Sequence, residues 1–377
     1  MRENRPDIAT SYNNVGCAYV ELGEHKKALD YYLKVVDIQE KASPENYLDI
    51  ATLYNIIGSK YGELGDHKKQ LECYLKALKI KEKVLPENYL DIATSYNNVG
   101  FEYGELGNHK KQLDYYLTAL AIREKVLPEN HSDIVVSYNN IGYAYYNLGD
   151  YKKQLDYYLK ALAIREKTLP ENYPDIAESY NAVGCVYYEL GEYKKALDYY
   201  SKALAIREKA LPENHPDIAT SYNNIGFAYG ELGEYKRELE YYLKVLSILK
   251  KVLPKNNTVV AISYYNVGHA YGELREYKKE LKYKLKALAI QKKLLPKNHS
   301  DIATWYSDVG ACYMGLKEYK KALQYLLKAT SIFEQTTPKN NTQLAKLYNR
   351  ISNAYANIED KENSEKYLKL YQQYNVW

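Results

Sequence analysis

The chain has 377 residues, of which 46% are apolar and 27% charged, and a net charge of +4. This composition predicts a folded protein rather than a disordered chain. The first ten residues contain no apolar stretch, and no window reaches the roughly 18 consecutive apolar residues of a membrane span. The four cysteines form no C-x-x-C motif and no closely spaced pairs, which is typical of reduced thiols. We therefore expect a cytoplasmic protein without a disulfide framework.

A pattern of 42 residues repeats along the whole chain, and about nine copies account for its length. Each copy has a glycine, replaced by Ser352 in the ninth, with a tyrosine four residues before it and another three residues after it, as in Tyr96, Gly100 and Tyr103. This spacing places the three residues on one face of a helix. Repeats of this length predict a single continuous array. Its units are 7–48, 49–90, 91–132, 133–174, 175–216, 217–258, 259–300, 301–342 and 343–377.

Each unit is predicted to hold two helices. In the third unit Gly107 ends the first helix, because glycine readily takes the left-handed conformation, and residues 110–127 then carry apolar residues at helical spacing up to Pro128. The proline recurs in eight units and stops the second helix each time: Pro44, Pro86, Pro128, Pro170, Pro212, Pro254, Pro296 and Pro338. An aspartate such as Asp133 ends most of the following loops, where it suits an N-cap or a first helical turn.

The last units are less regular. The turn glycine becomes Arg275, Lys317 and Glu359, each costing about 1 kcal/mol if the left-handed conformation is kept. Residues 361–377 are predicted to form a final helix that caps the array.

These motifs carry a family resemblance. The pattern Tyr12-x-x-Val15-Gly16-x-x-Tyr19, followed by Ala28-x-x-x-Tyr32, resembles the tetratricopeptide signature with Tyr in place of its Trp. The 42-residue period, the Asn97-Asn98 pair and the loop 213–219 resemble more narrowly the repeats of kinesin light chain. The resemblance implies an all-α, right-handed superhelix of about nine helix pairs, whose first helices line a concave inner wall. The chain shows no heptad segment of the kind that joins kinesin light chain to the heavy chain, so we do not expect motor association.

No pattern of an enzyme is found. The sequence has no H-E-x-x-H, G-x-S-x-G, P-loop or dinucleotide fingerprint, and its histidines, apart from His269, occupy repeat-equivalent turn or loop positions. Cys17 and Cys185 are too far along the array from His269 to predict a nucleophilic dyad. We therefore expect no catalytic residue, no cofactor and no metal site.

Asparagines dominate the face of the first helix that lies beside the Tyr-Gly-Tyr face. They occupy two successive positions, although Asn is a poor residue for a helix interior, by about 0.5 kcal/mol relative to Ala. The first position holds Asn13, Asn55, Asn97, Asn139, Asn181, Asn223 and Asn349, with Tyr265 and Ser307 breaking the series; the second holds Asn14, Asn98, Asn140, Asn224 and Asn266. Carboxamides both donate and accept hydrogen bonds, and in peptide-binding tetratricopeptide domains such asparagines clamp a peptide backbone. The alternative is that the amides bond to one another and are structural.

The residue following each glycine varies and is a candidate for specificity. The middle units place Phe101, Tyr143, Cys185 and Phe227 there, a stripe suited to an apolar anchor of a partner. Ordinary packing between helices is the other interpretation of this stripe.

Charge is unevenly distributed. Residues 1–216 carry a net charge of −5 and residues 217–377 one of +9, which together give the total of +4. The seventh unit supplies most of the excess through lysines on its second helix: Lys278, Lys279, Lys282, Lys284, Lys286, Lys292 and Lys293. We interpret them as a solvated outer face, with an acidic partner or a membrane surface as the alternative. Nucleic acid is not expected, because no second basic stripe with interleaved aromatic residues is present.

The sequence thus predicts a non-catalytic scaffold or adaptor that binds extended peptide segments of partner proteins along the inner wall. One alternative is a ligand-sensing or regulatory domain of a larger signalling enzyme or ATPase. Another is a scaffold that assembles with copies of itself. The oligomeric state and the partner are not predicted.

Overall fold

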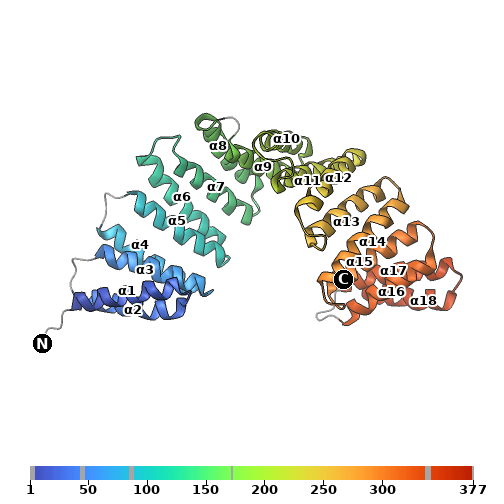
Figure 1. Cartoon of the computed structure of the whole chain (residues 1–377), viewed down its shortest axis with the longest axis horizontal. Coiled ribbons are helices and arrows are strands. Elements are labelled where there is room, and N and C mark those ends of the chain that lie inside the picture. The colour runs from blue at the N-terminus through green and yellow to red at the C-terminus, as the bar shows by residue number, and fades with distance from the viewer. Residues whose placement is uncertain (1–4, 43–46, 85–88, 171–172, 336–340, 376–377) are drawn as a thin grey trace. The chain divides into compact units, whose positions relative to one another are not determined.

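The computed structural model describes residues 5–42, 47–84, 89–170, 173–335 and 341–375, and these segments form 18 α-helices and no strand. The chain divides into two compact parts, which we call the N-terminal part (residues 1–171) and the C-terminal part (residues 172–377). In each part an odd-numbered helix packs on the helix that follows it, and the pairs stack in chain order (Figure 1). The predicted all-α array of helix pairs is confirmed.

The helices of the N-terminal part are α1 (Arg5–Glu21), α2 (His25–Ala42), α3 (Tyr47–Glu63), α4 (His67–Val84), α5 (Tyr89–Glu105), α6 (His109–Val126), α7 (Ser132–Asn147) and α8 (Tyr151–Thr168). The helices of the C-terminal part are α9 (Pro174–Glu189), α10 (Tyr193–Ala210), α11 (Pro216–Glu231), α12 (Tyr235–Val252), α13 (Thr258–Glu273), α14 (Tyr277–Leu294), α15 (Ser300–Gly315), α16 (Tyr319–Gln335), α17 (Asn341–Asn357) and α18 (Lys361–Tyr374). Helix α6 ends two residues before Pro128, as predicted, whereas Pro44, Pro86 and Pro338 lie outside the described residues.

Tyrosine rings join the two helices of each pair. In α5, Tyr96 and Tyr103 hold the ring of Tyr115 from α6 between them, with centroids 5.7 and 5.3 Å away. Gly100 lies against the neighbouring Tyr116, and a Cβ at this glycine would stand 2.8 Å from that ring. The predicted packing of this face on the second helix is therefore confirmed. The same group of three rings forms in all the remaining 42-residue units except the second, where Cys73 takes the central place.

Polar contacts join one pair to the next. The hydroxyl of Tyr54 in α3 donates to Glu40 of α2 at 2.6 Å, and the same bond spaced by 14 residues recurs later in the chain. Arg123, 6% exposed at the end of α6, donates to Ser137 of α7 at 2.7 Å. A buried guanidinium is stable only when it is hydrogen-bonded in this way.

Three helix starts use a cap that the sequence did not predict. His131, His215 and His299 are the N-caps of α7, α11 and α15, and the Nδ1 of each accepts the backbone N–H two residues later. The aspartates that follow them lie in the first helical turn, where a carboxylate favours the positive end of the helix dipole.

The turns inside the helix pairs are left-handed, as predicted. Gly233 has a φ of 73°, and Arg275, Lys317 and Glu359 hold the same conformation with φ of 58°, 59° and 62°. Irregular sequence therefore does not change the turn, and the last units keep the backbone of the others. The final helix, α18, covers residues 361–374 of the predicted segment 361–377.

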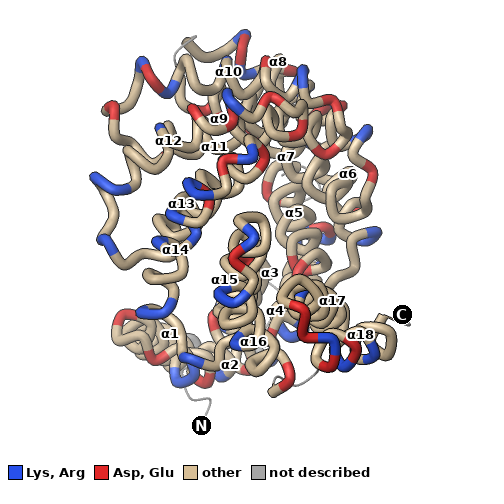
Figure 2. Tube along the Cα trace, turned by 90° about the vertical axis from the view of Figure 1, so that its right-hand side faces the viewer, with Lys and Arg blue, Asp and Glu red and all other residues tan. Residues whose placement is uncertain are grey.

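One prediction about the seventh unit is wrong. Lys284 is not on a solvated face, because it takes the position that Tyr242 has in the preceding unit and is only 7% exposed. Its stem packs on Gly268, and its ammonium pairs with the buried Glu280 at 2.7 Å. Charged residues elsewhere are distributed along the helices of both the N-terminal and the C-terminal part (Figure 2).

Candidate functional site

In the N-terminal part and in the C-terminal part alike, the predicted asparagines occupy the same positions of the odd-numbered helices, and we call this surface the asparagine face. The first-position residues are all half-buried. Among the second-position residues Asn14 is exposed, and Asn98, Asn140, Asn224 and Asn266 are half-buried. Their amides are therefore held by the fold while part of each side chain stays open to solvent.

Amides of neighbouring pairs bond to each other in a fixed register. Asn140 of α7 donates through Nδ2 to Oδ1 of Asn97 in α5 at 2.7 Å. Asn224 donates in the same way to Asn181 at 2.8 Å, and Asn266 to Asn223 at 3.4 Å. A second-position amide thus bonds to the first-position amide of the preceding unit, 43 residues earlier. This is the contact expected if the asparagines stabilise the stack.

These bonds leave part of each amide unused. A carboxamide has two N–H donors and an oxygen with two lone pairs. The bond from Asn140 to Asn97 uses one donor of the former and one lone pair of the latter. The NH₂ group of Asn97 and the oxygen of Asn140 keep their capacity for a ligand, so the two interpretations of the asparagines are compatible.

The register continues where asparagine is lost. Arg350 of α17 donates to Ser307 of α15 at 2.9 Å, again 43 residues apart. The hydroxyl of Tyr265 in α13 interacts with the carboxylate of Asp308 in α15. The seventh to ninth units therefore keep the contact between pairs but change its chemistry from neutral amides to charged and aromatic groups.

The aromatic candidates lie open beside this face. Phe101 and Tyr143 in the N-terminal part are 51% and 53% exposed, and Phe227 in the C-terminal part is 43% exposed. Tyr146, which the sequence analysis did not select, stacks on Tyr143 with centroids 6.2 Å apart and is 47% exposed. It stands where the preceding unit has Gly104, and this change from glycine to tyrosine is the signal that could have identified it.

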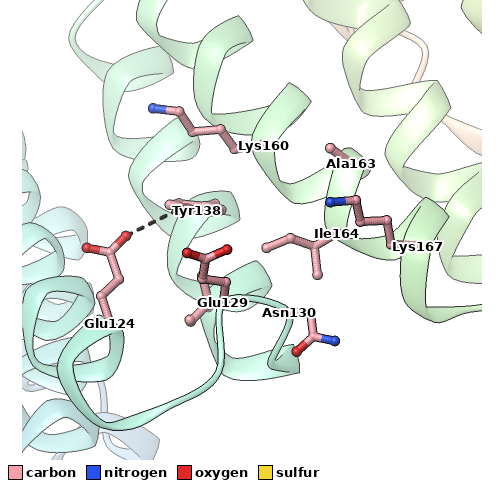
Figure 3. A pocket seen from close by; sticks show the side chains of 9 residues that line it. Glu124, Glu129, Asn130, Tyr138, Lys160, Ala163, Ile164 and Lys167 are labelled. Carbon is pink, nitrogen blue, oxygen red and sulfur yellow. Dashed lines mark hydrogen bonds between the residues drawn. The ribbon is translucent and has the colours of Figure 1, made fainter.

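A pocket of about 450 Å³ lies elsewhere in the N-terminal part, between α6, the loop after it, α7 and α8. Glu124 and Glu129 face Lys160 and Lys167 across it, and Tyr138 donates to Glu124 at 3.2 Å (Figure 3). Lys160 is also paired with Asp156 at 2.8 Å. Two acidic and two basic residues balance each other, so the pocket favours neither sign of ligand charge.

Two of the four cysteines are buried, and one histidine lies near two glutamates. Burial raises the pKa of Cys73 to about 11 and that of Cys312 to about 12, which keeps both thiols protonated and unreactive. His269 lies 3.9 Å from Glu238 and 3.8 Å from Glu273, and the neighbouring carboxylate of Glu238 raises its pKa. Within the described segments no group of His, Cys, Asp and Glu is arranged to hold a metal ion, and no helix is long and apolar enough to cross a membrane.

Comparison with known proteins establishes the family. A tetratricopeptide repeat model matches residues 49–125, 133–209, 202–251 and 217–293, and two other tetratricopeptide repeat models match residues 8–46, 306–336 and 345–375. The chain belongs to the tetratricopeptide repeat family, whose members are generally non-catalytic scaffolds for protein interactions. No match was found among curated proteins.

Solved structures share the fold at low sequence identity. A putative kinesin light chain with nearly identical repeats, from Podosopora anserina, is 22% identical over 55% of this chain and 98% of its own, with a TM-score of 0.50. The apo form of RapI is 17% identical over 97% of both chains, with a TM-score of 0.60. A signal transduction ATPase with a tetratricopeptide repeat sensor, from Pyrococcus horikoshii, is 18% identical, with a TM-score of 0.62 over 93% of this chain and 53% of its own. The predicted likeness to kinesin-light-chain repeats is confirmed at the level of the fold.

Proposed function

We propose that this chain is a non-catalytic scaffold or adaptor that binds extended peptide segments of partner proteins along the asparagine face. An extended peptide presents alternating N–H and C=O groups, and each of them costs free energy if it is desolvated without a partner. The asparagines supply both donors and acceptors at a fixed spacing along the stack. Backbone contacts of this kind hold a peptide without selecting its side chains.

The amide pairs are the observation that carries this proposal. The bond from Asn140 to Asn97 fixes the orientation of both carboxamides before a ligand arrives. A preorganised group loses less conformational entropy on binding than a free side chain does. Exposed aromatic residues beside the pairs, such as Phe101 and Tyr143, would then select side chains of the partner.

A screen of displayed peptides tests the proposal. The wild-type chain is compared with a triple variant, Asn97→Ala, Asn139→Ala and Asn223→Ala. Each lost hydrogen bond is expected to cost about 1 kcal/mol, so the variant should bind selected peptides about 100-fold more weakly. The matched control is Asn130→Ala, Asn214→Ala and Asn298→Ala, because these three asparagines occupy the same loop position in the third, fifth and seventh units.

Stability measurements separate the two roles of the asparagines. Alanine is the better helix former, so a triple variant whose amides serve only ligand binding should melt at or above the wild-type temperature. Equal peptide binding by wild type and variant, together with a lower melting temperature of the variant, would show that the amides are structural and would refute the proposal.

A regulatory role in a larger signalling protein is the second candidate. It is favoured by the likeness to the ATPase with a tetratricopeptide repeat sensor, in which this fold accounts for 53% of the other chain. The distinguishing observation is the transcript that encodes this chain. An effector domain in the same reading frame would support the sensor role, and a transcript that encodes only the array would refute it.

A further inference from the structure

A second pocket, which we call the α13–α15 pocket, interrupts the asparagine face in the C-terminal part. It has a volume of about 210 Å³ and lies between two first helices, α13 and α15. Its lining residues are Ile262, Tyr265, Asp301, Thr304, Trp305 and Asp308.

Three substitutions at repeat positions create this pocket. Tyr265 stands at the first position of the asparagine face and Asp308 at the second, where most other units have asparagine. Trp305 stands where Ser221 lies two units earlier. Ser221 is 1% exposed and accepts a bond from Arg207 at 2.7 Å. Tryptophan is too large for that buried place, so its ring is half-exposed instead and meets Tyr265 edge-on, with centroids 5.1 Å apart and planes at 80°.

The pocket joins aromatic walls to acidic groups. Trp305 and Tyr265 offer ring faces and edges, and Ile262 adds an aliphatic surface. Asp301 and Asp308 supply two carboxylates, and the side chain of Asp301 is 65% exposed. Ring faces attract cations, and carboxylates form strong charge-assisted bonds with ammonium and guanidinium groups. This combination favours a ligand with an aliphatic stem and a positive end.

Two nearby cations are bonded to other groups, and His299, whose Nδ1 lies 3.7 Å from a carboxylate oxygen of Asp301, accepts the backbone N–H of Asp301 through that nitrogen. Lys284 lies over the ring of Tyr265 at 5.3 Å, but its ammonium is bonded to Glu280 at 2.7 Å. Arg350 donates to Ser307. Burial raises the pKa of Asp308 in spite of the attraction of Lys284, the hydroxyl of Tyr265 and Arg350, so a further cation beside this carboxylate would stabilise its charged form.

We propose that the α13–α15 pocket binds a basic side chain, arginine or lysine, of a bound peptide segment. The cationic group lies at Asp301 and Asp308, and the stem packs on Trp305 and Ile262. The inference rests on the proposed function in that the side chain belongs to a peptide held along the asparagine face. It adds a preference for one basic residue at the place where the asparagine face is interrupted.

Trp305 allows the pocket to be tested without a peptide. The chain has two tryptophans, so the variant Trp377→Phe leaves Trp305 as the only one. Its fluorescence is followed during titration with Nα-acetyl-arginine amide and Nα-acetyl-lysine amide, and with the uncharged Nα-acetyl-citrulline amide and Nα-acetyl-norleucine amide. The basic ligands are expected to bind in the millimolar range, at least about tenfold more tightly than the uncharged ones, and less tightly at high salt.

Two acidic variants and one control complete the test. Asp301→Asn and Asp308→Asn should each weaken binding of the basic ligands about tenfold, as expected for the loss of a charge-assisted bond. Asp217→Asn should leave it unchanged, because Asp217 occupies the position of Asp301 two units earlier and does not line the pocket. Asp301 is exposed and its replacement should not disturb folding, which circular dichroism checks.

Several outcomes would overturn the inference. These are equal binding of basic and uncharged ligands, no saturable response of Trp305 below about 50 mM ligand, and full affinity in both acidic variants. Peptides that bind through the asparagine face without preference for a basic residue would overturn it while leaving the proposed function intact. If the wild-type chain bound no peptide while Nα-acetyl-arginine amide and Nα-acetyl-lysine amide still bound at Trp305, only the proposed function would be refuted.

Discussion

Replacing the left-handed turn residues of the last units with glycine should stabilise the protein. Arg275 and Lys317 have φ of 58° and 59°, and both side chains are exposed. The turn at Arg275 makes the same bonds as the turn at Gly233: its N–H donates to the carbonyl three residues earlier, at 2.8 Å against 2.9 Å. The substitution therefore changes the residue without changing the backbone it must adopt.

The expected gain follows from two opposing effects. A residue with a Cβ pays about 1–2 kcal/mol in the left-handed region, whereas glycine loses about 0.4–1 kcal/mol more backbone entropy on folding. Arg275→Gly and Lys317→Gly should each stabilise the chain by about 0.5–1 kcal/mol. The reverse change, Gly233→Arg, should destabilise it by a similar amount.

Denaturation in guanidinium chloride measures the gain as a higher midpoint with an unchanged slope. Repeat arrays do not always unfold in one step, so hydrogen exchange of amides in α14 and α16 provides a local measurement. If both glycine variants were neutral or less stable while Gly233→Arg had no effect, left-handed backbone strain would not be the cause, and the reasoning would be refuted.

Three further predictions concern packing, titration and contacts between pairs. Gly226→Ala would place a Cβ 2.6 Å from the ring of Tyr242 and should lower stability by about 1–3 kcal/mol, seen as a lower melting temperature. Glu102 is 1% exposed, and burial raises its pKa above the ordinary 4.5. The folded chain therefore holds the proton of the Glu102 carboxyl group more tightly than the unfolded chain does. The stability that this protonation contributes is present below pH 4.5 and is lost as pH rises through the raised pKa. Glu102→Gln avoids that loss, so its melting temperature relative to wild type should increase from about pH 4 to about pH 7, and a constant difference would contradict the assignment. Tyr54→Phe removes the 2.6 Å bond to Glu40 and should cost about 1 kcal/mol in denaturation.

Much of the fold could be predicted because each unit repeats the same local signals. Helical spacing of Tyr96, Gly100 and Tyr103 identified the face that packs on α6, and prolines and turn glycines marked the helix ends. The left-handed turns at Arg275 and Lys317 lie at positions where other units have the turn glycine, as the alignment of the repeats indicated. These features depend on residues close in sequence, so the pattern alone determines them.

Other features depend on how neighbouring pairs approach each other. The bond between Asn140 and Asn97 requires a particular offset of α7 on α5, which no pattern within one unit reveals. Lys284 was interpreted by its charge, yet its place in the repeat is a buried one, and Glu280 satisfies it there. Trp305 lines a pocket because a serine position could not enclose it. In each case the position in the repeat was more informative than the type of residue.

The contacts that join neighbouring pairs have a consequence for how such a protein changes length. The bond of Tyr54 to Glu40 spans 14 residues and that of Asn140 to Asn97 spans 43, and each connects one unit only with the next. Deletion of residues 91–132 would bring Asn140 opposite Asn55 and Tyr138 opposite Glu82, which are partners of the same types. Recombination that gains or loses whole multiples of 42 residues therefore restores the inter-unit hydrogen bonds at the new junction, whereas any other insertion within a helix breaks them.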